Sequence, residues 1–201
     1  EGESILENAA REPEVVDLAN FLLACGARIE GQGTSCLRVQ GVSSLHGAEY
    51  AVMADRIEAG TFLVAAGITG GELLLRHCPF AELEAVILKL QSMGMDITAT
   101  PDGVLAKCGC PLRGADITTQ PYPGFPTDMQ AQIMALMCLA DGASVVEESI
   151  FENRFRYVDE LIRMGASIQV ESNIAIINGI EQFSGTSVTV PDLRAGAALV
   201  I

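Results

Sequence analysis

Phe125-Pro126-Thr127-Asp128-Met129-Gln130-Ala131-Gln132 opens the most apolar helix that the sequence predicts, whose body runs from Ile133 to Ala140. A helix with almost no polar face is typical of one buried on nearly all sides. Its start is different, because Thr127 or Asp128 is expected to cap the free N–H groups at the positive end of the helix dipole. Such an N-terminus suits an anionic ligand. Asp128 is therefore either a helix cap or a catalytic carboxylate.

The same helix start occurs three times along the chain. Asp55, Asp128 and Asp192 each head a predicted helix rich in Ala, Val, Leu, Ile or Met. From position alone, a plain cap is the more ordinary role for all three aspartates.

Glycines that end predicted helices also recur, at Gly26, Gly94 and Gly165, about 70 residues apart. The residues that flank these glycines are similar: Cys-Gly-Ala-Arg-Ile, Met-Gly-Met-Asp-Ile and Met-Gly-Ala-Ser-Ile. This period is too long for the common solenoid repeats. It suits a βαβαββ unit used several times, which predicts an α/β fold with mixed sheets.

The repeat places the predicted elements. Strands are expected at residues 3–7, 28–30, 36–40, 50–53, 72–76, 96–99, 104–107, 116–119, 143–148, 167–170, 174–177 and 186–190. Helices are expected at about 13–25, 55–66, 81–93, 127–140 and 152–164, and again from Asp192. The first copy lacks its opening strand and helix, and the last copy holds only two elements. We therefore expect the chain to be a piece of a longer protein.

Composition excludes several classes of protein. Hydrophobic residues make up 49% and charged residues 19%, which is typical of a globular protein rather than a disordered one. The formal charge of −14 argues against nonspecific nucleic-acid binding. No apolar run is long enough for a membrane span, and no signal peptide opens the chain, so a cytoplasmic location is expected. The six Cys are expected to be reduced thiols without a metal site.

Five stretches together resemble the enolpyruvyl transferases, the family that includes EPSP synthase. They lie in order along the whole chain: residues 7–14 (Glu-Asn-Ala-Ala-Arg-Glu-Pro-Glu), 55–61 (Asp-Arg-Ile-Glu-Ala-Gly-Thr), 125–132, 151–155 (Phe-Glu-Asn-Arg-Phe) and 192–195 (Asp-Leu-Arg-Ala). The resemblance implies two domains built as inside-out α/β barrels, each from three βαβαββ units with buried helices and outer mixed sheets. Residues 1–50 would be the last part of the first domain, and 51–201 most of the second. The active site would lie in the cleft between them.

Within the family, these five stretches are most similar to those of the members that act on a nucleotide sugar. The resemblance then implies transfer of the enolpyruvyl group of phosphoenolpyruvate to the 3-hydroxyl of UDP-N-acetylglucosamine, with release of phosphate, in peptidoglycan precursor synthesis. It implies no cofactor. A shikimate-pathway enolpyruvyl transferase and a non-catalytic paralogue that binds a nucleotide sugar are the alternatives.

The resemblance also implies site residues. Asp128 would contact the sugar hydroxyl and is a candidate base, and Ile150 would contact the nucleotide sugar. Arg194 would lie at the phosphoenolpyruvate site, where it could bind phosphate or carboxylate; by itself it would usually be a surface arginine. Arg154 and Glu12 lie in matching motifs near the cleft.

Some of the family's residues match nothing in this chain. They are the phosphoenolpyruvate-binding Lys, the reactive Cys on a mobile loop and a later Arg. The chain alone is therefore not expected to turn over substrate, and it needs the missing N-terminal and C-terminal parts of the same enzyme.

Overall fold

The computed structural model describes residues 2–201, which divide into two compact units. Unit 1 runs up to Ala54 and includes Pro121–Pro123; unit 2 comprises Asp55–Gln120 and Gly124–Ile201. Each unit is an α/β structure, and each is described by itself.

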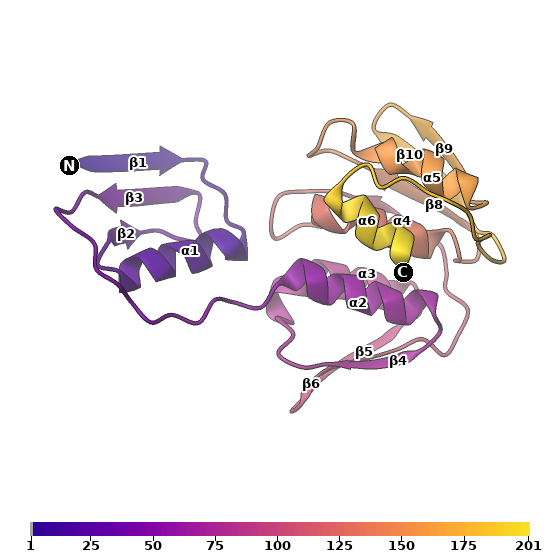
Figure 1. Cartoon of the computed structure of the whole chain (residues 1–201), viewed down its shortest axis with the longest axis horizontal. Helices are drawn as coiled ribbons and strands as arrows, with labels where there is room; N and C mark the ends of the chain where they lie inside the picture. Colours follow the sequence, from indigo (N-terminus) through magenta and orange to yellow (C-terminus); the bar gives the residue numbers. More distant parts are fainter. Residues whose placement is uncertain (1) are drawn as a thin grey trace. The chain divides into compact units, whose positions relative to one another are not determined.

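Unit 1 is a small antiparallel sheet with one helix (Figure 1). The strand order is β1-β3-β2, and both pairings are antiparallel. Pro13 lies at the start of the helix, where its missing N–H is tolerated, and Gly26 follows its end with φ +94°. The elements are β1 (Glu3–Glu7), α1 (Pro13–Ala24), β2 (Arg28–Glu30) and β3 (Cys36–Gln40).

Unit 2 contains two sheets. The order β4-β6-β5 is antiparallel throughout, whereas β7-β8-β10-β9 combines a parallel β7–β8 pair with antiparallel pairs. The predicted α/β class with a mixed sheet is therefore confirmed. The elements are α2 (Arg56–Ile68), β4 (Glu72–Leu75), η1 (Ala81–Leu83), α3 (Glu84–Ser92), β5 (Asp96–Thr100), β6 (Gly103–Lys107), β7 (Ile117–Thr118), η2 (Thr127–Met129), α4 (Gln130–Met137), β8 (Ala143–Glu147), η3 (Arg154–Tyr157), α5 (Val158–Arg163), β9 (Ser167–Glu171), β10 (Ile174–Asn178) and α6 (Leu193–Val200).

The core of unit 2 forms around α4. In Figure 1, α2, α4 and α6 lie between the two sheets, and α4 contacts both of the other helices. All eight residues of α4 are buried, including its polar Gln130 and Gln132. The predicted helix without a wet face is therefore confirmed, and it begins with the 3-10 turn η2.

Two predicted strands, 50–53 and 186–190, do not form. One backbone N–H group in each segment is hydrogen-bonded to a side chain instead of to a neighbouring strand. Met53 N donates to Asp17 Oδ1 (3.3 Å), and Thr189 N donates to Glu160 Oε2 (3.1 Å). A strand needs a partner for its backbone groups, and sequence periodicity does not reveal whether one is present.

Candidate active site

The turn before α4 is not capped as the sequence predicts. Pro126 is extended, Thr127–Met129 form a 3-10 turn, and no side chain accepts a hydrogen bond from the start of η2 or α4. Met129 N instead donates to the carbonyl oxygen of Pro126 (3.0 Å). The expectation that Thr127 or Asp128 caps the helix is therefore wrong, because both side chains are bound elsewhere.

The other two aspartates are true caps. Asp55 Oδ1 accepts from Ile57 N (2.8 Å) and Glu58 N (3.0 Å). Asp192 Oδ1 accepts from the backbone N–H groups of the second and third residues after it (2.8 and 2.9 Å). Asp128 thus differs from its two counterparts in the repeat.

Asp128 lies between two arginines. Arg154 Nη2 donates to its Oδ1 (2.9 Å), and Arg194 Nη2 donates to its Oδ2 (2.8 Å). The side chain of Arg154 is only 8% exposed, against 30% for Arg194 and 41% for Asp128. Such charge-assisted hydrogen bonds are shorter and stronger than neutral ones. The carboxylate is therefore held from one side by a buried cation and from the other by an accessible one.

Arg154 is buried at the start of η3, where it contacts two other residues of the chain besides Asp128. It begins η3, directly after Asn153, which adopts a left-handed conformation with φ +57°. Its Nη2 also donates to the carbonyl oxygen of Thr127 (3.2 Å), and its guanidinium carbon lies 4.8 Å from the centre of the Phe151 ring. Its Nε is buried and has no hydrogen-bond partner in the described part of the chain.

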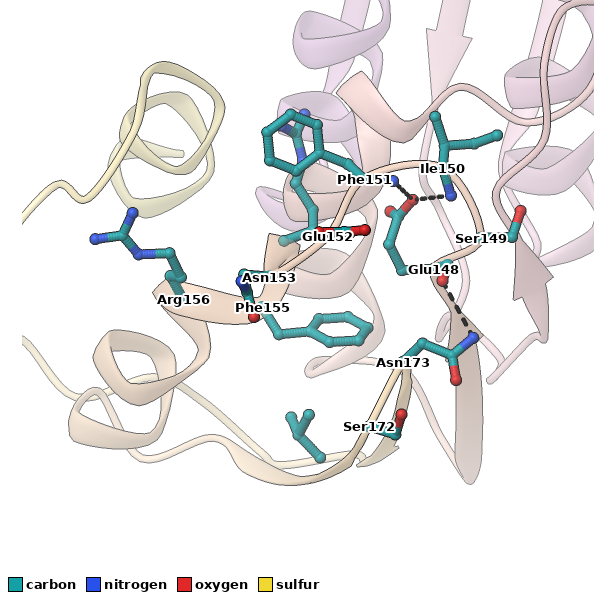
Figure 2. A pocket seen from close by; sticks show the side chains of 12 residues that line it. Glu148, Ser149, Ile150, Phe151, Glu152, Asn153, Phe155, Arg156, Ser172 and Asn173 are labelled. Atoms are coloured by element: carbon teal, nitrogen blue, oxygen red, sulfur yellow. Dashed lines mark hydrogen bonds between the residues drawn. The ribbon is translucent and has the colours of Figure 1, made fainter.

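Ile150 lies on the loop that links β8 to η3, at the wall of a pocket of about 640 Å³ (Figure 2). The segment from Glu148 to Arg156, which includes this loop and the start of η3, forms one side of this pocket, and the β9–β10 turn with Ser172 and Asn173 forms another. Arg154 also lines it, whereas Asp128 and Arg194 do not. Ile150 is 45% exposed, so its side chain is available to a ligand.

Glu12 belongs to unit 1, whereas Asp128, Arg154 and Arg194 belong to unit 2. It occupies the position before α1 but makes no capping hydrogen bond, and its Oε2 is buried without a partner among residues 2–201. Its predicted part in substrate binding stays a prediction. The structure brings together Asp128, Arg154 and Arg194, and places Ile150 in the same pocket as Arg154.

Sequence reasoning missed Glu148, which is 5% exposed and bound by five donors. The alternation of residues along β8 did contain a signal for this buried carboxylate. Ser144 and Val146 on β8 are fully buried, and Glu148 continues the same alternation of inward-facing residues. A carboxylate at an inward position requires hydrogen-bond donors around it.

The six cysteines are free thiols. Burial raises the pKa of Cys138 to about 12. Across residues 2–201, no group of three or more His, Cys, Asp or Glu side chains is placed to hold a metal ion. Over the same residues, no helix combines the length and the apolar character needed to cross a membrane.

Comparison with known proteins defines the class to which this fold belongs. The family model of EPSP synthase (3-phosphoshikimate 1-carboxyvinyltransferase) matches residues 1–201. The chain therefore belongs to this family, and the resemblance expected from its motifs is confirmed.

Individual relatives within this family carry a more specific name than the family model does. Over 202 residues the chain is 70% identical to UDP-N-acetylglucosamine 1-carboxyvinyltransferase of Desulfovibrio desulfuricans and 67% identical to the enzyme of that name from Nitratidesulfovibrio vulgaris. These matches cover 100% of this chain and 48% of each relative, so the chain spans about half the length of the curated relatives it matches.

Solved structures share the fold. The enolpyruvyl transferase NikO from Streptomyces tendae matches with a TM-score of 0.83 and 24% identity, over 99% of this chain and 48% of that one. EPSP synthase from Acinetobacter baumannii matches with a TM-score of 0.72 and 22% identity, over 99% of this chain and 49% of that one.

Proposed function

We propose that the full-length protein containing this chain transfers the enolpyruvyl group of phosphoenolpyruvate to the 3-hydroxyl of UDP-N-acetylglucosamine, releasing phosphate. The names of relatives up to 70% identical support the choice of substrates. The observation that carries the proposal is the carboxylate of Asp128, held between Arg154 and Arg194 instead of capping its helix. The reaction serves peptidoglycan precursor synthesis, in the cytoplasm.

The cluster offers the groups that this chemistry needs. The sugar hydroxyl must lose a proton as it attacks, and a carboxylate within hydrogen-bond reach can accept it. The phosphate and carboxylate of phosphoenolpyruvate need cationic partners. Asp128 is the proposed base, and Arg194 the proposed anion partner.

The two arginines differ in how easily they can leave Asp128. Arg194 is the more exposed, so an incoming anion can compete with Asp128 for its guanidinium. Arg154 is buried and also bound to the carbonyl oxygen of Thr127, so it stays in place. Binding of phosphoenolpyruvate would then free Oδ2 of Asp128 for the sugar hydroxyl, while Oδ1 remains fixed.

The remainder of the site would come from outside this chain. The Lys, the reactive Cys and the later Arg expected for the family match nothing in residues 1–201. In the proposed arrangement, residues 1–50 complete the first domain and 51–201 form most of the second as an inside-out barrel. Glu12 is the proposed substrate-binding residue of the first domain.

The test is phosphate release by the full-length protein. Asp128→Ala is expected to lower kcat by about 10²–10⁴-fold, the usual contribution of a general base. Asp102→Asn, in the exposed turn between β5 and β6, is the control for loss of a negative charge and is expected to keep normal turnover.

Three results would contradict the proposal. Near-normal turnover by Asp128→Ala would remove Asp128 as the base. Phosphate release with shikimate 3-phosphate, and none with UDP-N-acetylglucosamine, would favour the shikimate-pathway type. Binding of UDP-N-acetylglucosamine without turnover by the wild type would favour a non-catalytic paralogue.

A further inference from the structure

Glu148 is a buried carboxylate whose two oxygens face different segments. Oε1 accepts from Thr119 Oγ1 (2.7 Å) and from the backbone N–H groups of Ile150 (2.8 Å) and Phe151 (2.9 Å). Oε2 accepts from Thr127 Oγ1 (2.9 Å) and Gln130 Nε2 (3.0 Å). One oxygen thus holds the loop that carries Ile150, and the other holds the turn that carries Asp128.

The backbone of Glu148 is itself fixed. Glu148 N donates to the carbonyl oxygen of Asn173 (2.8 Å), and Asn173 Nδ2 donates to the carbonyl oxygen of Glu148 (3.2 Å). The next residue is held too, because Ser149 N donates to Thr119 Oγ1 (2.9 Å). Figure 2 shows the Glu148 carboxylate turned back onto the backbone of Ile150 and Phe151. The carboxylate is therefore a rigid point from which both segments are held.

We propose that Glu148 is a positioning residue that sets the Asp128 turn in register with the Ile150 loop. This inference rests on the proposed function, in which Asp128 takes a proton from the sugar, and on the role that the family resemblance implies for Ile150, contact with the nucleotide sugar. If the two segments move independently, the sugar can bind while its hydroxyl lies out of reach of the base.

A carboxylate suits this role because all five of its partners donate, and an ionised carboxylate is an acceptor only. Glutamine has nearly the same shape but presents one acceptor oxygen and one donor NH₂. The N–H groups of Ile150 and Phe151 belong to the backbone and cannot be reversed. A glutamine at position 148 is therefore expected to turn its oxygen toward them.

Its NH₂ group would then face Thr127 and Gln130. Gln130 cannot readily offer its own oxygen in return, because Gln130 Oε1 already accepts from the hydroxyl of Tyr157 (2.7 Å). The substitution Glu148→Gln thus loses the hydrogen bond from Gln130 and keeps that of Thr127 only if its hydroxyl turns to accept, so it loosens the Asp128 turn and leaves the Ile150 loop held. This asymmetry gives the proposal a specific kinetic signature.

The experiment measures phosphate release by the full-length protein with both substrates. Glu148→Gln is expected to lower kcat by about 10–100-fold, since a displacement near 1 Å can cost about 10²-fold. The KM for UDP-N-acetylglucosamine should stay near the wild-type value, because the sugar-binding loop keeps its hydrogen bonds. Glu148→Ala releases both segments and should raise that KM as well.

Two further variants separate positioning from folding. Ser144→Ala removes a buried hydrogen-bonding side chain of β8, the strand that Glu148 directly follows. The Ser144 hydroxyl accepts from Ala115 N (3.0 Å), and its loss is expected to lower stability but keep kcat. Thr127→Val removes only one donor to Oε2 and should lower kcat even if Glu148→Gln fails to fold. The double variant Thr127→Val/Glu148→Gln should lose less than the product of the two single effects.

The outcomes distinguish this inference from the proposed function. A wild-type protein that releases no phosphate would overturn the proposed function. An active wild type with unchanged kcat in both Glu148→Gln and Thr127→Val would overturn the positioning role alone. So would a fall in kcat that Ser144→Ala reproduces at equal loss of thermal stability.

Discussion

Three aspartates at matching places in the repeat have two different roles. Asp55 and Asp192 each accept two backbone hydrogen bonds at a helix start. Asp128 makes none of these and is paired with two arginines. Asp128 could have capped its helix but is held by two cations instead. An acidic residue in such a position is a candidate catalytic residue.

At the residue scale, Arg194 is expected to act on one substrate. Arg194→Ala in the full-length protein should raise the KM for phosphoenolpyruvate about tenfold or more, as loss of a hydrogen bond to a charged group of about 1.5–3 kcal/mol implies. Arg194→Lys keeps the charge and should show a smaller effect. Steady-state assays with each substrate varied in turn provide the measurement.

Arg163→Ala is the matched control, because Arg163 lies on α5 and pairs with Glu160 (3.5 Å) away from Asp128. It should leave both KM values unchanged. Equal rises in KM for the two substrates in Arg194→Ala would show that Arg194 does not single out the anion.

At the element scale, helix α4 shows how burial and a polar start are combined. Its body is apolar and fully buried, and Gln130 and Gln132 are buried with it. Gln130 bonds Glu148 and Tyr157, and Gln132 Nε2 donates to Thr61 Oγ1 on α2 (3.0 Å). The polar residues of this helix thus connect it to its neighbours instead of to solvent.

The capping of α2 gives a second prediction. Asp55→Ala in the full-length protein should lower the free energy of unfolding by about 0.5–2 kcal/mol, since two N–H groups lose their acceptor. Asp55→Ser restores a capping oxygen and should recover most of this loss. Denaturant unfolding of the two variants measures the difference, and equal stabilities would exclude the cap as its cause.

At the scale of the whole molecule, the two units are unequal. The contiguous hydrophobic core lies wholly in unit 2, whereas in the described part of unit 1 only Ala19 and Cys25 are buried. Cys138 lies in the core of unit 2 and is fully buried. The stability of the fold should therefore depend on keeping this thiol neutral.

The pH dependence of stability tests that point. Burial raises the pKa of Cys138 from 9.0 to about 12, so the unfolded chain loses this proton before the folded one does. Its contribution to stability is complete below pH 9 and is lost as the pH rises toward 12. Burial also raises the pKa of Tyr157 well above 10, which acts in the same direction.

Cys138→Ala removes the first of these contributions and keeps the second. Between pH 9 and 11 its denaturant midpoint should fall less steeply than that of the wild type, although the variant is less stable at neutral pH. Parallel pH profiles of the two proteins would show that the thiol does not titrate as its burial implies.

The sequence alone determined the α/β class with mixed sheets, the buried helix at α4 and the ends of most elements. These follow from local properties: the spacing of apolar residues, a glycine such as Gly26 at a left-handed position, or a proline such as Pro13 at a helix start. Its motifs also identified the family, and with it Asp128, Arg154 and Arg194 as candidates.

Only the tertiary structure decided what Asp128 binds. Arg154 and Arg194 lie 26 and 66 residues away along the chain, and Glu148 holds the adjacent Thr127 from 21 residues away. Residues 50–53 and 186–190 likewise form no strand, because a strand also needs a neighbouring strand to pair with, and the local sequence pattern does not specify one. Contacts between distant segments are set by packing of the whole chain. For this reason the carboxylate of Asp128, which its neighbours in the sequence predict to be a helix cap, is instead the centre of an ion-pair cluster.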